Sequence, residues 1–137
     1  MGDRLSPGSR PIVKLLRSLP ALLVMGMIFF FSHLPGNSLA LPAIFGFDKV
    51  LHMTAYAGLA AAVLYGLRPY RIAGWPAVIL TMTICIFYGI SDEYHQSFVP
   101  GRTVSAWDLA ADTLGALLLV VMAWRRNWQV ARWPTFS

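Results

Sequence analysis

The chain has 137 residues, of which 57% are apolar and only 12% are charged, and its formal net charge at pH 7 is +5. This composition excludes an ordinary soluble protein and leaves room for one domain. The basic residues form three short clusters beside predicted helix ends, as expected from membrane orientation and contact with anionic lipids. We therefore expect membrane lipids, and no nucleic acid, as partners.

The first apolar stretch covers about residues 19–34 and follows a basic N-terminal arm, residues 1–18. Ser18 before Pro20 predicts that a membrane helix begins here, since proline fits the first turn of a helix, where its missing N–H is not needed. If the helix begins earlier, Lys14 and Arg17 can still reach the lipid headgroups with their long side chains. The Pro-Gly-Asn sequence at residues 35–37 predicts the end of this helix.

A signal peptide is an alternative for the same stretch. Residues 38–40, Ser-Leu-Ala, resemble a cleavage site after a basic and then apolar segment. Cleavage after Ala40 would produce an unusually long leader, and Pro42 would lie just beyond the cut. We therefore predict a retained helix. In both cases the following connection lies on the same side of the membrane.

Three further apolar stretches predict membrane helices, at about residues 48–67, 75–96 and 105–124. Each is long enough to cross about 30 Å of hydrocarbon when it is helical. A short basic turn at residues 68–71 separates the first two of them, and Pro100-Gly101 predicts a tight turn before the last. The sequence thus predicts an all-α membrane protein, with a four-helix bundle over residues 19–124.

Charge alternates between the segments that flank these helices. Nine of the eleven Lys and Arg residues lie in the N-terminal arm, in the turn at residues 68–71 and in a Trp-containing tail at residues 125–137. The other two connections and the adjoining helix ends carry five of the six acidic residues, Asp48, Asp92, Glu93, Asp108 and Asp112, against only Lys49 and Arg102. Because an excess of Lys and Arg marks the cytoplasmic side, we expect both termini in the cytoplasm. The acidic residues would then face outward from the inner (cytoplasmic) membrane.

Residues four apart share a face of a helix. Three such groups occur at the predicted outer ends of the helices: Asp48, His52 and Tyr56; Asp92 and Gln96; Asp108 and Asp112. A polar helix face costs less free energy when it points to the interior of a membrane bundle than when it points to lipid. We therefore expect these groups, with Lys49, Arg102 and His95 close by, to form one network.

Helix capping is an alternative role for two of the carboxylates. Asp48 and Asp108 stand at predicted helix N-termini, where a carboxylate meets free N–H groups, and Ser105-x-x-Asp108 resembles a capping box. Asp92 and Glu93 differ, because the dipole at a helix C-terminus disfavours negative charge. We expect Arg102, across the Pro-Gly turn, to pair with them.

Asp92, Glu93, His52 and His95 are the candidates for acid–base catalysis, and the sequence leaves open whether the protein is an enzyme. Clusters of Asp, Glu and His can bind a divalent metal. However, no ligand motif with strict spacing is present, so we predict no metal and no cofactor. Nucleophile motifs and Gly-rich phosphate loops are also missing from the sequence.

Three segments closely resemble the VanZ-like membrane proteins: Asp-Lys-Val-Leu-His at residues 48–52 with Tyr56; Asp-Glu-Tyr-His-Gln-Ser-Phe-Val-Pro-Gly-Arg at residues 92–102; and Ser105-x-x-Asp108 with Asp112 and Gly115. The resemblance covers about residues 20–124. It implies a small multi-pass membrane protein of a family named for a protein associated with resistance to the glycopeptide teicoplanin. Asp112 departs from the Asn expected in many relatives, so its charge needs a partner or a proton.

The resemblance implies a signature composed of Asp48, His52, Asp92, Glu93, Gln96, Arg102 and Asp108, without a role for any of them. We expect an outward-facing pocket that binds a polar envelope component or a lipid-linked headgroup and affects glycopeptide susceptibility. Its binding residues would be this signature and Lys49, with Tyr56 and Asp112 in a secondary role. Arg102 and Lys49 would contact phosphate or carboxylate groups.

Two alternatives remain to the binding pocket. The first is a membrane-embedded hydrolase or transferase that acts on a lipid-linked substrate with Asp, Glu and His as acids and bases. The second is a purely structural ion-pair network in a membrane scaffold protein. The sequence leaves the oligomeric state open.

Overall fold

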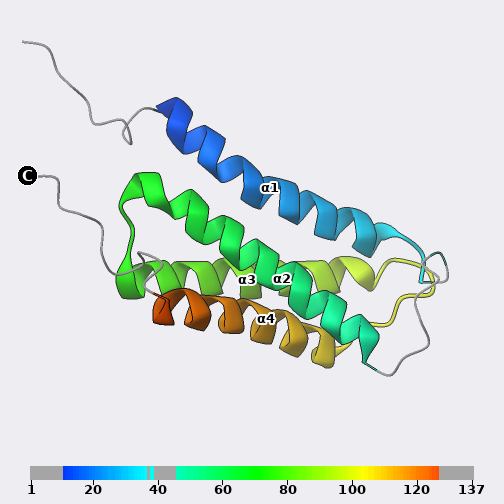
Figure 1. Ribbon diagram of the computed structural model, residues 1–137. Helices are drawn as coiled ribbons and strands as arrows, with labels where there is room; N and C mark the ends of the chain where they lie inside the picture. Colours follow the sequence, from blue (N-terminus) through cyan, green and yellow to red (C-terminus); the bar gives the residue numbers. More distant parts are fainter. Residues whose placement is uncertain (1–10, 37, 39–45, 127–137) are drawn as a thin grey trace, which may run out of the picture.

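The computed structural model describes residues 11–36, 38 and 46–126. This part of the chain forms four α helices and no strand. The elements are α1 (Pro11–His33), α2 (Phe47–Leu67), the 3₁₀ turn η2 (Arg68–Tyr70), α3 (Gly74–Gln96) and α4 (Ala106–Arg125) (Figure 1). Each of the four α helices is long and apolar enough to cross a membrane. The predicted all-α fold with four membrane-capable helices is therefore confirmed.

The start of α1 was predicted wrongly, because the helix begins at Pro11 rather than near residue 19. Pro11 takes the first-turn position, and Pro20 lies inside the helix. The Ser18 hydroxyl donates to the Leu15 carbonyl (2.8 Å) instead of capping a new helix. An internal proline is tolerated in membrane helices, where side chains and local adjustments satisfy the freed backbone groups. Much of the predicted N-terminal arm is thus helical.

The other three helices begin and end within one residue of the predicted boundaries. The turn predicted at Pro100-Gly101 is also present, since the Arg102 N–H donates to the Val99 carbonyl (3.1 Å). Three parts of the predictions lie outside the described residues: the arm at residues 1–10, the cleavage position after Ala40, and the tail at residues 127–137.

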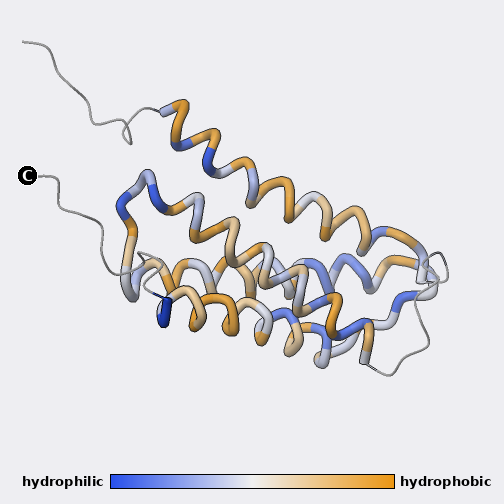
Figure 2. Tube along the Cα trace, in the orientation of Figure 1, coloured by the Kyte–Doolittle hydropathy of each residue, from blue (hydrophilic) through white to orange (hydrophobic). Residues whose placement is uncertain are grey.

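Large apolar side chains cover the outside of the bundle. Leu23, Ile79 and Phe87 are 67%, 62% and 68% exposed, in the middle parts of α1 and α3. Figure 2 shows this apolar band along the helices, with hydrophilic residues concentrated towards their ends. In water such a surface would favour aggregation, whereas in a bilayer it faces lipid chains. The exposed surface therefore agrees with a membrane environment.

Small residues let the helices approach closely around the site. A Cβ atom on Gly115 of α4 would collide with the main chain of Met53 in α2. A Cβ atom on Gly89 of α3 would lie 3.0 Å from Cδ1 of Leu109 and 3.4 Å from Oδ2 of Asp112, both in α4. Close backbone contact through small residues is a common way for membrane helices to pack. Glycine at both positions brings α2 and α3 up against α4.

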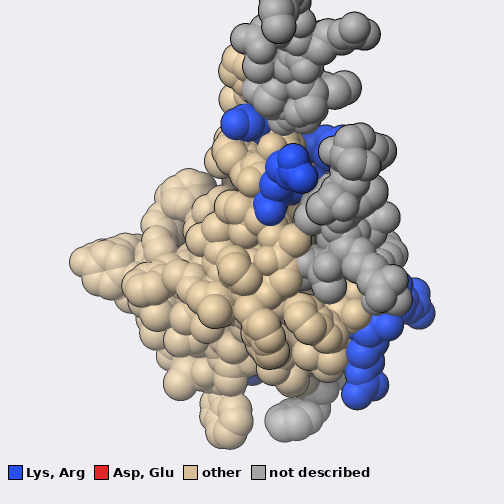
Figure 3. Space-filling view, turned by 90° about the vertical axis from the view of Figure 1, so that its left-hand side faces the viewer, with Lys and Arg blue, Asp and Glu red and all other residues tan. Residues whose placement is uncertain are grey.

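The two ends of the bundle carry opposite charges. At the end where α1 starts, Lys14 lies over the Tyr70 ring, and both Arg17 and Arg68 lie over the Tyr65 ring. Figure 3 views this end and shows Lys and Arg side chains with no Asp or Glu in sight. The acidic residues of α2, α3 and α4 lie at the opposite end. The basic and acidic segments that alternate along the sequence therefore lie at opposite ends of the bundle.

Candidate functional site

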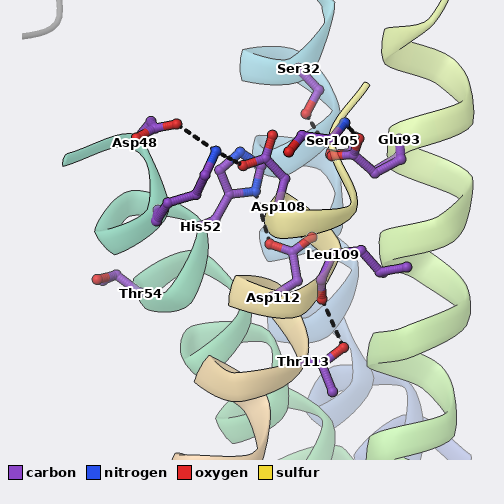
Figure 4. A network of polar contacts seen from close by, with 12 residues as sticks. Ser32, Asp48, His52, Thr54, Glu93, Ser105, Asp108, Leu109, Asp112 and Thr113 are labelled. Carbon is purple, nitrogen blue, oxygen red and sulfur yellow. Dashed lines mark hydrogen bonds and ion pairs between the residues drawn. The ribbon is translucent and has the colours of Figure 1, made fainter. Parts of the chain in front are cut away.

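The candidate residues meet where α2 and α4 begin and α3 ends (Figure 4). The start of α2 supplies Asp48, Lys49 and His52; the end of α3 supplies Asp92, Glu93 and Gln96; the start of α4 supplies Asp108 and Asp112. The structure thus brings these residues of the predicted network together, whereas His95 and Arg102, which were expected to join it, contact other groups.

His52, Glu93 and Asp112 form the core of this network, one residue from each of α2, α3 and α4, and we name them the His–Glu–Asp centre. Nδ1 of His52 lies 2.8 Å from Oδ1 of Asp112. One donor atom from each of the three residues lies within 4.8 Å of the others. Asp112 is 1% exposed and Glu93 is 6% exposed, so both carboxyl groups are withdrawn from solvent. The partner that Asp112 needs is therefore His52.

The carboxyl groups of Asp92 and Glu93 accept hydrogen bonds from neutral groups. Oδ2 of Asp92 accepts from the Ser32 hydroxyl (2.8 Å) and from the Gln96 amide (2.9 Å). Oε2 of Glu93 accepts from the backbone N–H of Ser105 (2.9 Å). The Ser32 contact ties α1 to α3, and the Ser105 contact ties the end of α3 to the start of α4. Ser32 carries no charge and lies outside the three segments that resemble the family, so no sequence pattern marks it as a site residue.

The expected pairing of Arg102 with Asp92 or Glu93 is not found among the described ion pairs. Arg102 instead donates to the main-chain carbonyls of Phe31 (2.7 Å) and Leu34 (3.1 Å) at the end of α1. The last carbonyls of a helix lack intrahelical donors and form the negative end of its dipole. These carbonyls therefore attract the guanidinium group away from the carboxylates.

Lys49 is also held by protein oxygens. Its Nζ atom donates to Oδ2 of Asp48 (2.6 Å) and to Oδ1 of Asp108. The predicted capping box is therefore incomplete, because the Asp108 side chain pairs with Lys49. The Ser105 hydroxyl does cap α4 by accepting from the Trp107 N–H (3.2 Å), whereas α2 has no side-chain cap at Gly46. Ser105 is therefore the N-cap of α4, whereas Asp48 and Asp108, the two carboxylates for which capping was the alternative, both pair with Lys49.

Several buried polar atoms at the site have no hydrogen-bond partner among the described residues. They are Oδ1 of Asp92, Oε1 of Glu93, Oδ2 of Asp112 and the hydroxyl oxygen of Tyr56. A buried polar group left without a partner costs about 1–3 kcal/mol. A concentration of such atoms is uncommon in folded proteins and calls for an explanation. An arrangement of this kind can accept an ion, a ligand donor or a proton.

His95 lies apart from the His–Glu–Asp centre. Its Nε2 atom lies 3.2 Å from Nδ1 of His33, and its ring packs on Phe29. His95 and Phe29 border a cleft of about 340 Å³ between α1 and the end of α3. The cleft is lined by Phe29, Tyr88, Ser91, Asp92, Tyr94, His95 and Phe98. The two candidate catalytic histidines thus belong to different places, with Asp92 beside His95 and Glu93 beside His52.

The fold and the site define a small membrane protein with four described helices and a polar, acidic centre at one end of the bundle. A family model described as VanZ/LLP1 matches residues 18–128. The match spans most of the chain, so the protein belongs to the VanZ/LLP1 family, and the resemblance seen in the sequence is confirmed. Comparisons with curated proteins and with solved structures give no match.

Proposed function

We propose that this protein binds a polar component of the cell envelope, such as the headgroup of a lipid-linked precursor, at the acidic end of its bundle. Binding would alter envelope properties, including susceptibility to glycopeptides such as teicoplanin. The observation that carries the proposal is Asp92, which lines the cleft between α1 and α3 and has a buried oxygen, Oδ1, with no hydrogen-bond partner in the described part of the chain.

The composition of the cleft supports an amphiphilic ligand with hydrogen-bond donors. Small-molecule sites typically combine apolar and aromatic walls with a few polar groups that set orientation. Here Phe29 and Phe98 supply aromatic walls, and Asp92 and His95 supply the polar groups. A carboxylate accepts hydrogen bonds from hydroxyl or amine groups. Sugar or peptide headgroups on a lipid anchor offer both kinds of donor.

The contacts of the cations change the expected mode of recognition. Lys49 and Arg102 were expected to bind anionic groups of the ligand. Both instead donate to protein oxygens, Lys49 to carboxylates and Arg102 to main-chain carbonyls. We therefore assign recognition to the polar groups that line the cleft, Asp92 and His95, and Arg102 to holding the end of α1 beside the cleft.

Substitutions in the cleft test this proposal. Asp92→Asn and Phe29→Ala should abolish the difference in teicoplanin susceptibility between cells with and without the protein, while the protein still accumulates in membranes. Asp48→Asn is the matched control, because Asp48 is a carboxylate at the same end of the bundle but outside the cleft. The proposal fails if cleft variants that accumulate normally behave as the wild type does, and a purely structural network would then explain the site.

An enzymatic role is a second candidate, and the His52–Asp112 hydrogen bond beside Glu93 favours it. A histidine oriented by one carboxylate and placed near another suits general acid–base catalysis. A hydrolase or transferase acting on a lipid-linked substrate would lose turnover in Glu93→Gln with its fold retained. Turnover of a lipid-linked substrate by the purified wild type, unchanged in that variant, would count against Glu93 as the base.

A further inference from the structure

We propose that the His–Glu–Asp centre binds one divalent transition-metal ion. His52 would supply an imidazole nitrogen, and Glu93 and Asp112 would each supply a carboxylate oxygen. This inference goes beyond the proposed function, because the cleft beside Asp92 could bind its ligand with or without an ion at the centre.

The geometry of the centre suits a shared ion. The ligand atoms of a tetrahedral ion with bonds of about 2.1 Å lie roughly 3.4 Å apart. Nδ1 of His52 and Oδ1 of Asp112 are 2.8 Å apart, and the third donor completes a set within 4.8 Å. Side-chain movements of roughly 1 Å would therefore bring the three donors to the separation that such an ion needs.

The free oxygens of the centre provide a second, independent observation. Oδ2 of Asp112 and Oε1 of Glu93 are buried and have no partner among the described residues. Oδ2 of Asp112 lies towards α3, 3.4 Å from the position that a Cβ atom on Gly89 would take. The Asp112 oxygen that does not bind His52 thus lies beside the helix that carries Glu93.

Charge balance favours a cation over a neutral ligand. With a neutral imidazole, the centre carries two negative charges, and in the described part of the chain neither carboxylate pairs with Lys or Arg. Lys49 and Arg102, the nearby cations, are held by other oxygens. A divalent ion cancels both charges within the buried site, where an unpaired charge is costly.

The ligand types narrow the choice of ion. Carboxylates alone suit Mg²⁺ and Ca²⁺, whereas an imidazole nitrogen favours ions such as Zn²⁺ and Fe²⁺. One nitrogen and two oxygens also leave a coordination position free for water or a ligand, as in catalytic zinc sites. We therefore use Zn²⁺ as the probe and Mg²⁺ as the comparison ion.

Metal analysis of the full chain, purified in detergent and dialysed against Zn²⁺, tests the proposal. The wild type should retain about one Zn²⁺ per chain, and Glu93→Gln and Asp112→Asn should each lower retention by about tenfold or more. His95→Ala is the matched control, because His95 forms the neighbouring imidazole pair with His33, which could also hold zinc. That variant should retain the metal, and the proposal is overturned if it loses zinc while Glu93→Gln does not.

Thermal unfolding provides a second test of zinc binding, in case a variant folds poorly. Zn²⁺, but not Mg²⁺, should raise the melting temperature of the wild type and of His95→Ala and should leave that of Glu93→Gln unchanged. Equal Zn²⁺ responses in wild type and Glu93→Gln would overturn the proposal. If the effect on teicoplanin susceptibility is kept in Glu93→Gln but lost in Asp92→Asn, the cleft functions without the ion. The metal hypothesis can therefore fail while the hypothesis of ligand binding in the cleft holds.

Discussion

At the centre of the site, the His52 imidazole and the Asp112 carboxyl group share a hydrogen bond in a space largely closed to solvent. Asp48 and Lys49 form the contrasting case, since the Asp48 side chain is 52% exposed. Removing one partner of a buried pair leaves the other group without compensation, whereas an exposed pair is screened by water. Similar polar contacts therefore differ in how much they contribute to stability.

Asp112→Ala should accordingly lower the free energy of unfolding by about 1–3 kcal/mol, because His52 loses its buried partner. Asp112→Asn should cost less, since the amide can still hydrogen-bond to the imidazole. Asp48→Asn should change stability by less than about 1 kcal/mol. Unfolding followed by circular dichroism in detergent measures all three. An effect of Asp48→Asn as large as that of Asp112→Ala would contradict this ranking.

Double-mutant cycles can separate the partners of Asp92. Ser32→Ala combined with Asp92→Asn should show a coupling of about 0.5–1.5 kcal/mol, because the two side chains share a hydrogen bond. Arg102→Gln combined with Asp92→Asn should be additive within about 0.5 kcal/mol, since Arg102 contacts α1 carbonyls. A coupling found in the Arg102 cycle but not in the Ser32 cycle would instead support the Arg102–Asp92 ion pair expected from the sequence.

At the level of the helices, the site depends on how closely α2, α3 and α4 approach one another. Gly115 stands one turn after Asp112 on α4 and touches the main chain of Met53, the neighbour of His52. Gly89 stands one turn before Glu93 on α3 and faces α4. Each glycine thus sets a helix separation next to a residue of the His–Glu–Asp centre.

Gly115→Ala should therefore lower stability by about 1–3 kcal/mol, because a methyl group at this position collides with the Met53 main chain. Gly58→Ala on α2 is the control, since a Cβ atom there meets nothing within 4 Å. That change should be neutral or stabilising by up to about 1 kcal/mol, as expected for replacing glycine inside a helix. Unfolding midpoints in one detergent compare the two. Equal effects would mean that the close crossing at Gly115 is unimportant.

At the level of the whole molecule, opposite charges occupy opposite ends of an apolar bundle. Lys and Arg of short connections remain on the cytoplasmic side during insertion. We therefore propose that both termini lie in the cytoplasm and that the acidic end, with the cleft and the His–Glu–Asp centre, faces outward. This orientation would let the site reach envelope components directly.

Cysteine labelling of intact cells tests this orientation. A membrane-impermeant maleimide should label Thr103→Cys, in the exposed loop before α4, without permeabilisation. Tyr70→Cys, at the basic end, should react only after permeabilisation. The natural Cys85 is buried and should contribute little background. Labelling of position 70 but not 103 in intact cells would reverse the proposed orientation.

The sequence alone predicted the helices well, with α1 as the exception. A membrane helix must satisfy its own backbone groups, so apolar length and turn residues largely determine where it starts and ends. Pro20 misled the prediction, because proline at a helix start and proline inside a membrane helix look alike in sequence. Residues four apart also grouped the polar side chains at one end correctly, since helical periodicity does not depend on neighbouring helices.

The pairing of those side chains was decided only by the tertiary structure. Periodicity places Asp112 on a face of α4, but the approach of α2 and α4 at Gly115 determines that His52 meets it. Arg102 had two sets of acceptors within reach, and the position of the α1 end gave it the carbonyls instead of Asp92. Partner choice depends on the rotation and separation of helices distant in sequence. Local sequence patterns do not contain these quantities.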